Sequence, residues 1–95
     1  MAWVRHGTLV ADTVAEVELP NRSFDSVEVV NRDGADEIFF VVAKDGVATE
    51  PEVDGNDCEV LPASMNALTV NAPDPGPVTV RLISAGTPKY SVRAE

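Results

Sequence analysis

Few side chains in this sequence of 95 residues have the types that carry out acid–base, nucleophilic or metal chemistry. His6 is the sole histidine and Cys58 the sole cysteine, so a Ser-His-Asp or Cys-His arrangement would have to use them. Such chemistry needs an oriented base, and His6 lies close to the chain start, where we interpret it as an exposed residue. Cys58 has no second cysteine for the usual zinc spacings, and we interpret it as a small buried hydrophobic residue. Neither residue is predicted to be catalytic.

The segment DGNDCE, residues 54–59, resembles the start of a calcium-binding loop. Such a loop needs oxygen ligands at alternate positions and a glutamate at the twelfth. Counting from Asp54, Cys58 and Val60 take two of the alternate positions, and the twelfth is Met65. We therefore interpret the segment as a turn.

A second acidic cluster consists of Asp33, Asp36 and Glu37. Weak binding of a divalent cation is one alternative, but turns favour Asp because its side chain bonds the local backbone. The sequence also lacks a glycine-rich phosphate loop and a basic patch with interleaved aromatic residues. We predict a protein that is not an enzyme and has no metal and no cofactor.

The elements that must position any site are organised around residues 24–43, FDSVEVVNRDGADEIFFVVA. Two segments rich in strand-forming residues flank the turn signal Asp33-Gly34, which predicts a β-hairpin with a connection at 31–37. In the second strand, alternation sends Ile38, Phe40 and Val42 to one face and Phe39, Val41 and Ala43 to the other. Both faces are apolar, so the second face needs cover from this chain or from another one.

Short strands with turns between them are predicted along the rest of the chain. In residues 13–19, Ala15, Val17 and Leu19 share one face and two glutamates the other, as in a half-buried strand. Further strands are expected at 58–61, 67–71, 78–84 and 89–93, whereas 47–57 is the least structured part. The prediction is an all-β fold, a small antiparallel β-sandwich or barrel of about seven or eight short strands.

The first eight residues are predicted to be an N-terminal arm or a short first strand, followed by a single domain over residues 9–95. Trp3 either fills its own core or anchors the arm to another chain, since Trp buries a large area in both settings. Val4 lies beside it, and Arg5 is the first positive charge of an acidic chain. Trp3, Val4 and Arg5 are our candidate partner-contact residues.

The net charge of −9 arises from 16 acidic and 7 basic residues. This charge repels phosphate, so we expect neither nucleic acid nor an anionic membrane as a partner, but a neutral or basic protein. No apolar run has the length of a membrane span. The chain start lacks the apolar core of a signal peptide, which predicts synthesis in a cytoplasm without Sec-type export.

Four segments carry a family resemblance: Leu19–Asp25, Val27–Gly34, Ile38–Val42 and Val78–Val92. They read Leu-Pro-x-x-x-Phe-Asp, Val-Glu-Val-x-Asn-Arg-Asp-Gly, an aliphatic–aromatic strand, and Val-x-Val-Arg-Leu-Ile-Ser-x-Gly-Thr-Pro-x-Tyr-Ser-Val. In this order the chain, from about Thr8 to its end, resembles small β-rich capsid decoration (cement) proteins of tailed phages of actinobacteria. The acidic residues 47–57 match least.

The resemblance implies a structural protein on the outer surface of the capsid in the virion, made in the host cytoplasm. It also implies a homotrimer at three-fold positions, bridging subunits of the major capsid protein and stabilising the shell. One alternative is another virion structural protein, at the head–tail junction or in the tail. Another is a β-sandwich module that binds a host surface or a sugar, although such a module would present more exposed aromatic residues.

Overall fold

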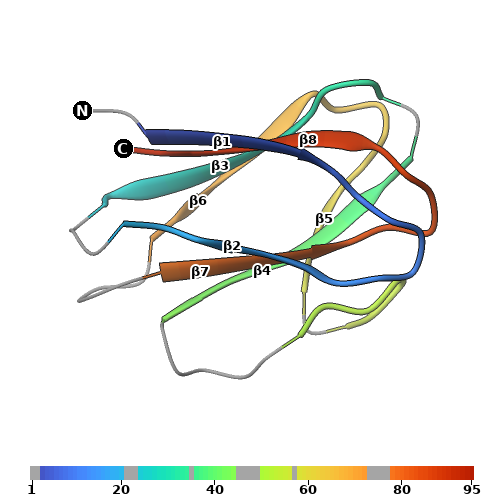
Figure 1. The fold of residues 1–95 in the computed structure, drawn as a ribbon, viewed down its shortest axis with the longest axis horizontal. Helices are drawn as coiled ribbons and strands as arrows, with labels where there is room; N and C mark the ends of the chain where they lie inside the picture. Colours follow the sequence, from blue (N-terminus) through green and yellow to red (C-terminus); the bar gives the residue numbers. More distant parts are fainter. Residues whose placement is uncertain (1–2, 21–23, 35, 45–49, 57, 73–77) are drawn as a thin grey trace.

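The computed structural model describes residues 3–20, 24–34, 36–44, 50–56, 58–72 and 78–95. This part of the chain contains eight strands, all antiparallel to their neighbours, and no helix. The strands form two four-stranded sheets that pack face to face (Figure 1). The predicted all-β fold is confirmed, in its sandwich form.

Each sheet draws its strands from the whole length of the chain. Sheet A has the order β1-β8-β3-β6 and sheet B the order β2-β7-β4-β5. The bounds are β1 Trp3–Thr8, β2 Ala15–Glu18, β3 Ser26–Asn31, β4 Ile38–Lys44, β5 Glu59–Leu61, β6 Ala67–Asn71, β7 Val78–Ile83 and β8 Lys89–Ala94. Residues 3–8 thus form the first strand, and residues 1 and 2 lie outside the described part.

The predicted β-hairpin within residues 24–43 is wrong. Its two strands exist, but β3 lies in sheet A and β4 in sheet B, so the turn between them crosses from one sheet to the other. Gly34 adopts a left-handed backbone with φ of 65°, as a tight turn requires. A local turn signal reports that the chain reverses, and it does not report whether the two strands then pair or stack.

Alternation along each strand supplies the core between the sheets. The inward side chains that are almost fully buried include Val27 and Val29 of β3, Val80 and Leu82 of β7, and Val92 of β8. Val17 of β2 and Tyr90 of β8 complete the layer. Burial of each large apolar side chain stabilises the fold by about 1.5–3 kcal/mol.

Strand β4 is covered on both faces, as predicted. Ile38 and Phe40 are fully buried against sheet A, while Phe39 is 6% exposed and Ala43 8% exposed on the opposite face. These exposures are those of a single chain, so the chain itself supplies the second cover. Residues 50–56 contribute to it, since Pro51 is buried and Val53 lines the same cavity as Phe39. Residues 50–56 therefore cover part of the outer face of sheet B.

Candidate partner-binding surface

Strand β1 forms one edge of sheet A, and its hydrogen bonds leave part of its backbone open. Trp3 lies opposite Ala94, and the backbone N–H of Leu9 donates to the carbonyl of Pro88 at 2.9 Å. Hydrogen-bonded pairs alternate in an antiparallel ladder, so residues 3, 5, 7 and 9 face β8. The backbone groups of residues 4, 6 and 8 point to the open edge, where the described part of the chain places no strand.

The three predicted contact residues lie together at the start of this edge. Trp3 is half-buried and packs against the core, so its ring belongs in part to its own domain. The guanidinium carbon of Arg5 lies 5.5 Å from the centroid of that ring, a cation–π contact of about 0.5–1 kcal/mol. Val4 projects from the outer face of sheet A and is 43% exposed. Trp3 therefore packs in part against the core and remains in part accessible at the edge of sheet A.

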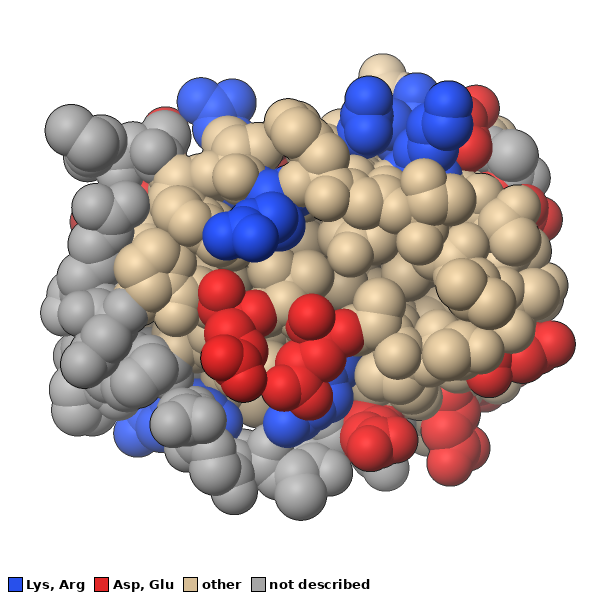
Figure 2. Space-filling model, viewed as in Figure 1, with Lys and Arg blue, Asp and Glu red and all other residues tan. Residues whose placement is uncertain are grey.

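A groove of about 520 Å³ runs between the edge strands β1 and β2, where the two sheets stay apart. Arg5 and His6 line it from β1, and Glu16 and Glu18 line it from β2. Figure 2 shows basic and acidic side chains on the face that these two strands cross. The two walls thus carry charges of opposite sign. Such a groove is better suited to orienting a polar or charged peptide than to binding an anion.

Partners within the domain hold two of the side chains that line the groove. The Nε of Arg81 lies 3.2 Å from Oε2 of Glu16, an ion pair that remains partly exposed. The Nδ1 of His6 lies 2.6 Å from the hydroxyl oxygen of Ser91 in the adjacent strand. His6 is exposed, as predicted, but it sits in a paired strand and its ring is fixed. The sequence did not reveal the groove, because β1 and β2 belong to different sheets.

Tyr90 lies at the inner side of the groove beside Gly7. Burial raises the pKa of the Tyr90 phenol, and the charge of Arg5 partly offsets that rise by lowering the same pKa. The phenol therefore stays protonated at neutral pH and is not an activated nucleophile or base. Gly7 lies within β1, opposite Tyr90.

His6 and Cys58, the two residues that a catalytic arrangement would have to use, lie far apart in the fold. His6 is on β1, at one edge of the sandwich, and Cys58 precedes β5, the edge strand at the other end of sheet B. Cys58 is half-buried where we predicted burial, and its thiol donates to the carbonyls of Glu52 and Gly55, both at 3.6 Å. Within the described residues, no group of three or more His, Cys, Asp or Glu side chains could hold a metal ion.

The calcium-like segment forms a turn in the residues that are described. The backbone N–H of Gly55 donates to the carbonyl of Glu52 at 2.9 Å, and Asp54 has a φ of 59°. Asp57 of the same segment lies outside the described residues.

The cluster Asp33, Asp36 and Glu37 belongs to a structural corner, which we define as residues 31–34, 36, 37 and 84–89. A carboxylate oxygen of Asp33 accepts a hydrogen bond from the backbone N–H of Lys89 at 3.1 Å. The carbonyl of Glu37 accepts one from the hydroxyl of Ser84 at 2.6 Å. These bonds tie the β3–β4 crossing to the β7–β8 crossing, Asp33 through its carboxylate and Glu37 through its backbone carbonyl.

Asn31 holds the corner from inside. Its side chain is 4% exposed, its Nδ2 donates to the carbonyl of Asp36 at 2.7 Å, and its Oδ1 accepts from the N–H of Gly34 at 3.0 Å. The segments Asn-Arg-Asp-Gly and Ile-Ser-x-Gly-Thr-Pro of the family resemblance both fall here. Their residue types follow from the tight packing of two crossing loops.

No protein-family model, curated protein or solved structure matches this chain. The described residues also contain no helix long and apolar enough to cross a membrane. The functional assignment of the β1 edge and its groove therefore depends on the side chains described above.

Proposed function

We propose that this protein is a non-enzymatic structural protein of a phage virion, which binds the outside of the capsid shell and stabilises it by bridging major capsid subunits. In this proposal it is made in the host cytoplasm and stands as a homotrimer at three-fold positions of the shell. The net charge of −9 supports a protein partner over nucleic acid or an anionic membrane. The segments of the family resemblance support the phage assignment.

The observation that carries the proposal is the open edge of β1. The apolar side chains of Trp3 and Val4 lie beside this edge and are called the rim. Backbone groups of residues 4, 6 and 8 are available for strand addition, in which main-chain hydrogen bonds supply affinity and side-chain pockets supply specificity. Val4 and the accessible part of Trp3 add apolar contact beside them. A shell protein that contributes an extended segment would be held by this edge.

The test adds purified protein to undecorated heads of the phage that carries the gene, and measures occupancy against protein concentration. Val4→Asp changes an exposed side chain at the rim, and Val10→Asp is its matched control, because Val10 is 64% exposed just beyond β1. We expect Val4→Asp to weaken head binding at least about tenfold, the effect of losing roughly 1.4 kcal/mol at a contact. Val10→Asp should bind like the wild type.

Trp3→Ala and a chain that starts at Thr8 complete the series, with thermal stability measured for each. Because Trp3 packs against the core, both changes should lower the stability of the monomer as well as its occupancy on heads. The valine pair separates the two effects, since neither valine is buried. Equal head binding by wild type and Val4→Asp would show that this rim is not the contact.

A further inference from the structure

Three Asp–Gly bonds occur in the sequence, at residues 33–34, 45–46 and 54–55. Such a bond can isomerise in water, because the backbone nitrogen of glycine, with no side chain beside it, reaches the side-chain carboxyl carbon of the aspartate. The nitrogen loses its proton, the carboxyl group loses its hydroxyl, and the two leave as water while a five-membered succinimide closes. Water then opens the ring at either carbonyl, which gives back aspartate or gives isoaspartate, whose main chain is one methylene longer. Residues 45 and 46 lie outside the described part of the chain, so the structure places the other two bonds.

The structural corner holds both reacting groups of the Asp33–Gly34 bond. The N–H of Gly34 donates to Oδ1 of Asn31 at 3.0 Å, and a carboxylate oxygen of Asp33 accepts from the N–H of Lys89 at 3.1 Å. Asn31 is itself fixed, since it is 4% exposed and its Nδ2 donates to the carbonyl of Asp36 at 2.7 Å. The reaction requires the nitrogen to lose its proton and the carboxyl group to turn toward it, so both hydrogen bonds must break first.

Only one reacting group of the Asp54–Gly55 bond is held in this way. The N–H of Gly55 donates to the carbonyl of Glu52 at 2.9 Å. Among the described residues, none holds the carboxylate of Asp54 by a hydrogen bond or an ion pair. Asp33 and Asp54 are both exposed, so water reaches both bonds and exposure does not distinguish them. The free carboxylate therefore makes Asp54–Gly55 the more reactive of the two bonds.

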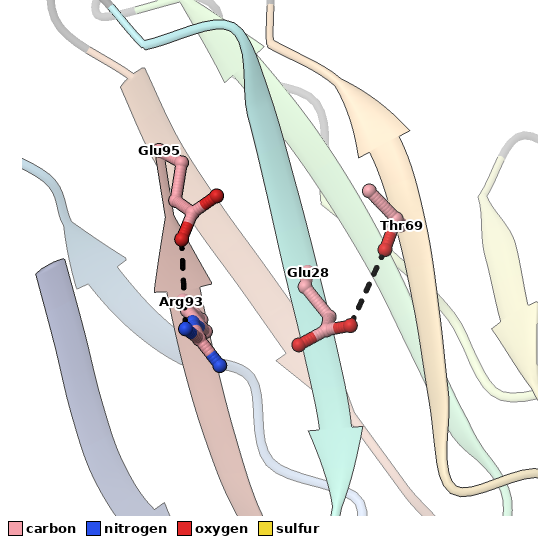
Figure 3. A network of polar contacts seen from close by, with 4 residues as sticks. All are labelled: Glu28, Thr69, Arg93 and Glu95. Atoms are coloured by element: carbon pink, nitrogen blue, oxygen red, sulfur yellow. Dashed lines mark hydrogen bonds and ion pairs between the residues drawn. The ribbon is translucent and has the colours of Figure 1, made fainter. Parts of the chain in front are cut away.

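The acidic side chains on the outer face of sheet A do not offer a comparable site. The hydroxyl of Thr69 donates to Oε2 of Glu28 at 3.4 Å, and Nη2 of Arg93 lies 3.5 Å from Oε1 of Glu95 (Figure 3). A glutamate would also have to close a six-membered ring, which forms less readily than the five-membered succinimide. The residue after Glu28 is a valine within β3, whose side chain hinders the attack.

We propose that Asp54–Gly55 is a modification site at which the folded protein isomerises in water, and that Asn31 and the backbone N–H of Lys89 protect Asp33–Gly34. Isoaspartate should form at least about tenfold faster at position 54 than at position 33, because the charge-assisted bond from Lys89 to Asp33 has no counterpart at Asp54. The inference concerns the free chain and does not depend on head binding.

Isomerisation at Asp54 changes the segment that covers sheet B, residues 50–56. The turn from Glu52 to Gly55 is closed by one backbone hydrogen bond, and an added methylene lengthens the chain inside this turn. The thiol of Cys58 donates to the carbonyls of the same two residues, both at 3.6 Å. A lengthened turn separates these carbonyls from the sulfur. The modified protein should therefore present a more accessible Cys58 thiol.

The first test incubates the folded protein at mildly acidic and at neutral pH and follows isoaspartate at each Asp–Gly bond by peptide mapping with an isoaspartyl methyltransferase. The rates are divided by those of synthetic peptides with the same local sequences, which removes the effect of neighbouring residues. Isoaspartate should accumulate at position 54 while position 33 stays almost unmodified. Equal relative rates at the two positions, or no isoaspartate at position 54, would overturn the inference.

The second test removes the protection of the corner. Asn31→Ala deprives the N–H of Gly34 of its acceptor and should raise isoaspartate at position 33 severalfold. Gly7→Ala is the matched control for lost stability, because a Cβ at Gly7 crowds Tyr90 in a different part of the fold. It should leave position 33 protected. An equal rise in both variants would show that global unfolding controls the reaction and that the corner does not.

The third test links the modification to the cover over sheet B. Asp54→Gly removes the carboxyl group and suits the φ of 59° at this position, so the turn is retained while the reaction is blocked. After incubation, the Cys58 thiol of the wild type should react faster with an aromatic disulfide reagent, and that of Asp54→Gly should react as it did at the start. Equal changes in the two proteins would show that isomerisation at Asp54 does not loosen the turn.

Discussion

The ring of Tyr90 fills the space in which a Cβ atom at Gly7 would lie. A Cβ built on Gly7 would come within 2.5 Å of the phenol oxygen and 2.6 Å of the ring carbon that bears it. The two residues are cross-strand neighbours in β1 and β8. The absence of a side chain at position 7 therefore lets the only tyrosine lie against the first strand and close the inner side of the groove.

Gly7→Ala should destabilise the domain by about 1–3 kcal/mol, the usual cost of forcing extra atoms into a packed site. Urea unfolding followed by tryptophan fluorescence measures this, because Trp3 lies in the same strand. Thr8→Ala, at an exposed position of β1, is the control and should change the free energy of unfolding little. If both variants unfold like the wild type, Tyr90 moves aside without cost.

The stability of the protein should fall as the pH rises above about 10, the pKa of an unperturbed tyrosine. Burial raises the pKa of Tyr90 in the folded state, so between the two pKa values the unfolded chain has lost a proton that the folded chain retains. The free energy of unfolding therefore falls as the pH rises through this interval. Urea unfolding at a series of alkaline pH values measures the fall, and Tyr90→Phe should reduce it. Ultraviolet titration of the single tyrosine should give a midpoint above that of the unfolded chain; a midpoint at or below it would contradict the expectation.

Phe39→Asp should unfold the free monomer, although Phe39 faces away from the main core. Residues of the same chain cover its ring, and an unpaired buried charge costs several kcal/mol, comparable with a total stability of ~5–15 kcal/mol. Phe40→Asp should do the same. Val60→Asp is the matched control, because Val60 is the cross-strand neighbour of Phe39 and is 40% exposed. Circular dichroism and thermal melting show which of the three variants still fold. A folded Phe39→Asp would mean that the cover over sheet B opens readily.

Asn31→Ala should cost about 1–3 kcal/mol, because it leaves the N–H of Gly34 and the carbonyl of Asp36 without their side-chain partner. Asn66→Ala is the control, since the described structure uses the backbone carbonyl of Asn66, which the change retains. Hydrogen exchange of the Gly34 and Lys89 amides should quicken in Asn31→Ala if the corner loosens. Unchanged exchange would show that Asp33 alone holds it.

The sequence predicted the features that depend on local alternation. Val17 and Leu19 are buried and Glu16 and Glu18 exposed, as the period of two requires. The predicted bounds 67–71 are those of β6, and the other predicted strands differ from the observed ones at their ends. Burial of β4 on both faces also followed from the sequence, because a strand with six consecutive apolar residues presents apolar side chains to both of its faces.

The features that depend on long-range assembly were not predictable in the same way. The pairing partner of β3 is set by which sheet each strand joins, and neither Asp33 nor Gly34 encodes that choice. The groove between β1 and β2 arises from two edges that meet only in the folded sandwich. The sequence could not decide whether Trp3 fills the core or remains available to a partner, because its ring packs against the core and is also partly accessible.

The pairing of Trp3 with Ala94 places the two ends of the described chain side by side, where β1 and β8 run together in Figure 1. A mechanical load applied between these ends would act across the β1–β8 ladder at its last pair. The hydrogen bonds would then break one after another, like a zipper, and not all together in shear. The ends are therefore poor points for bearing force.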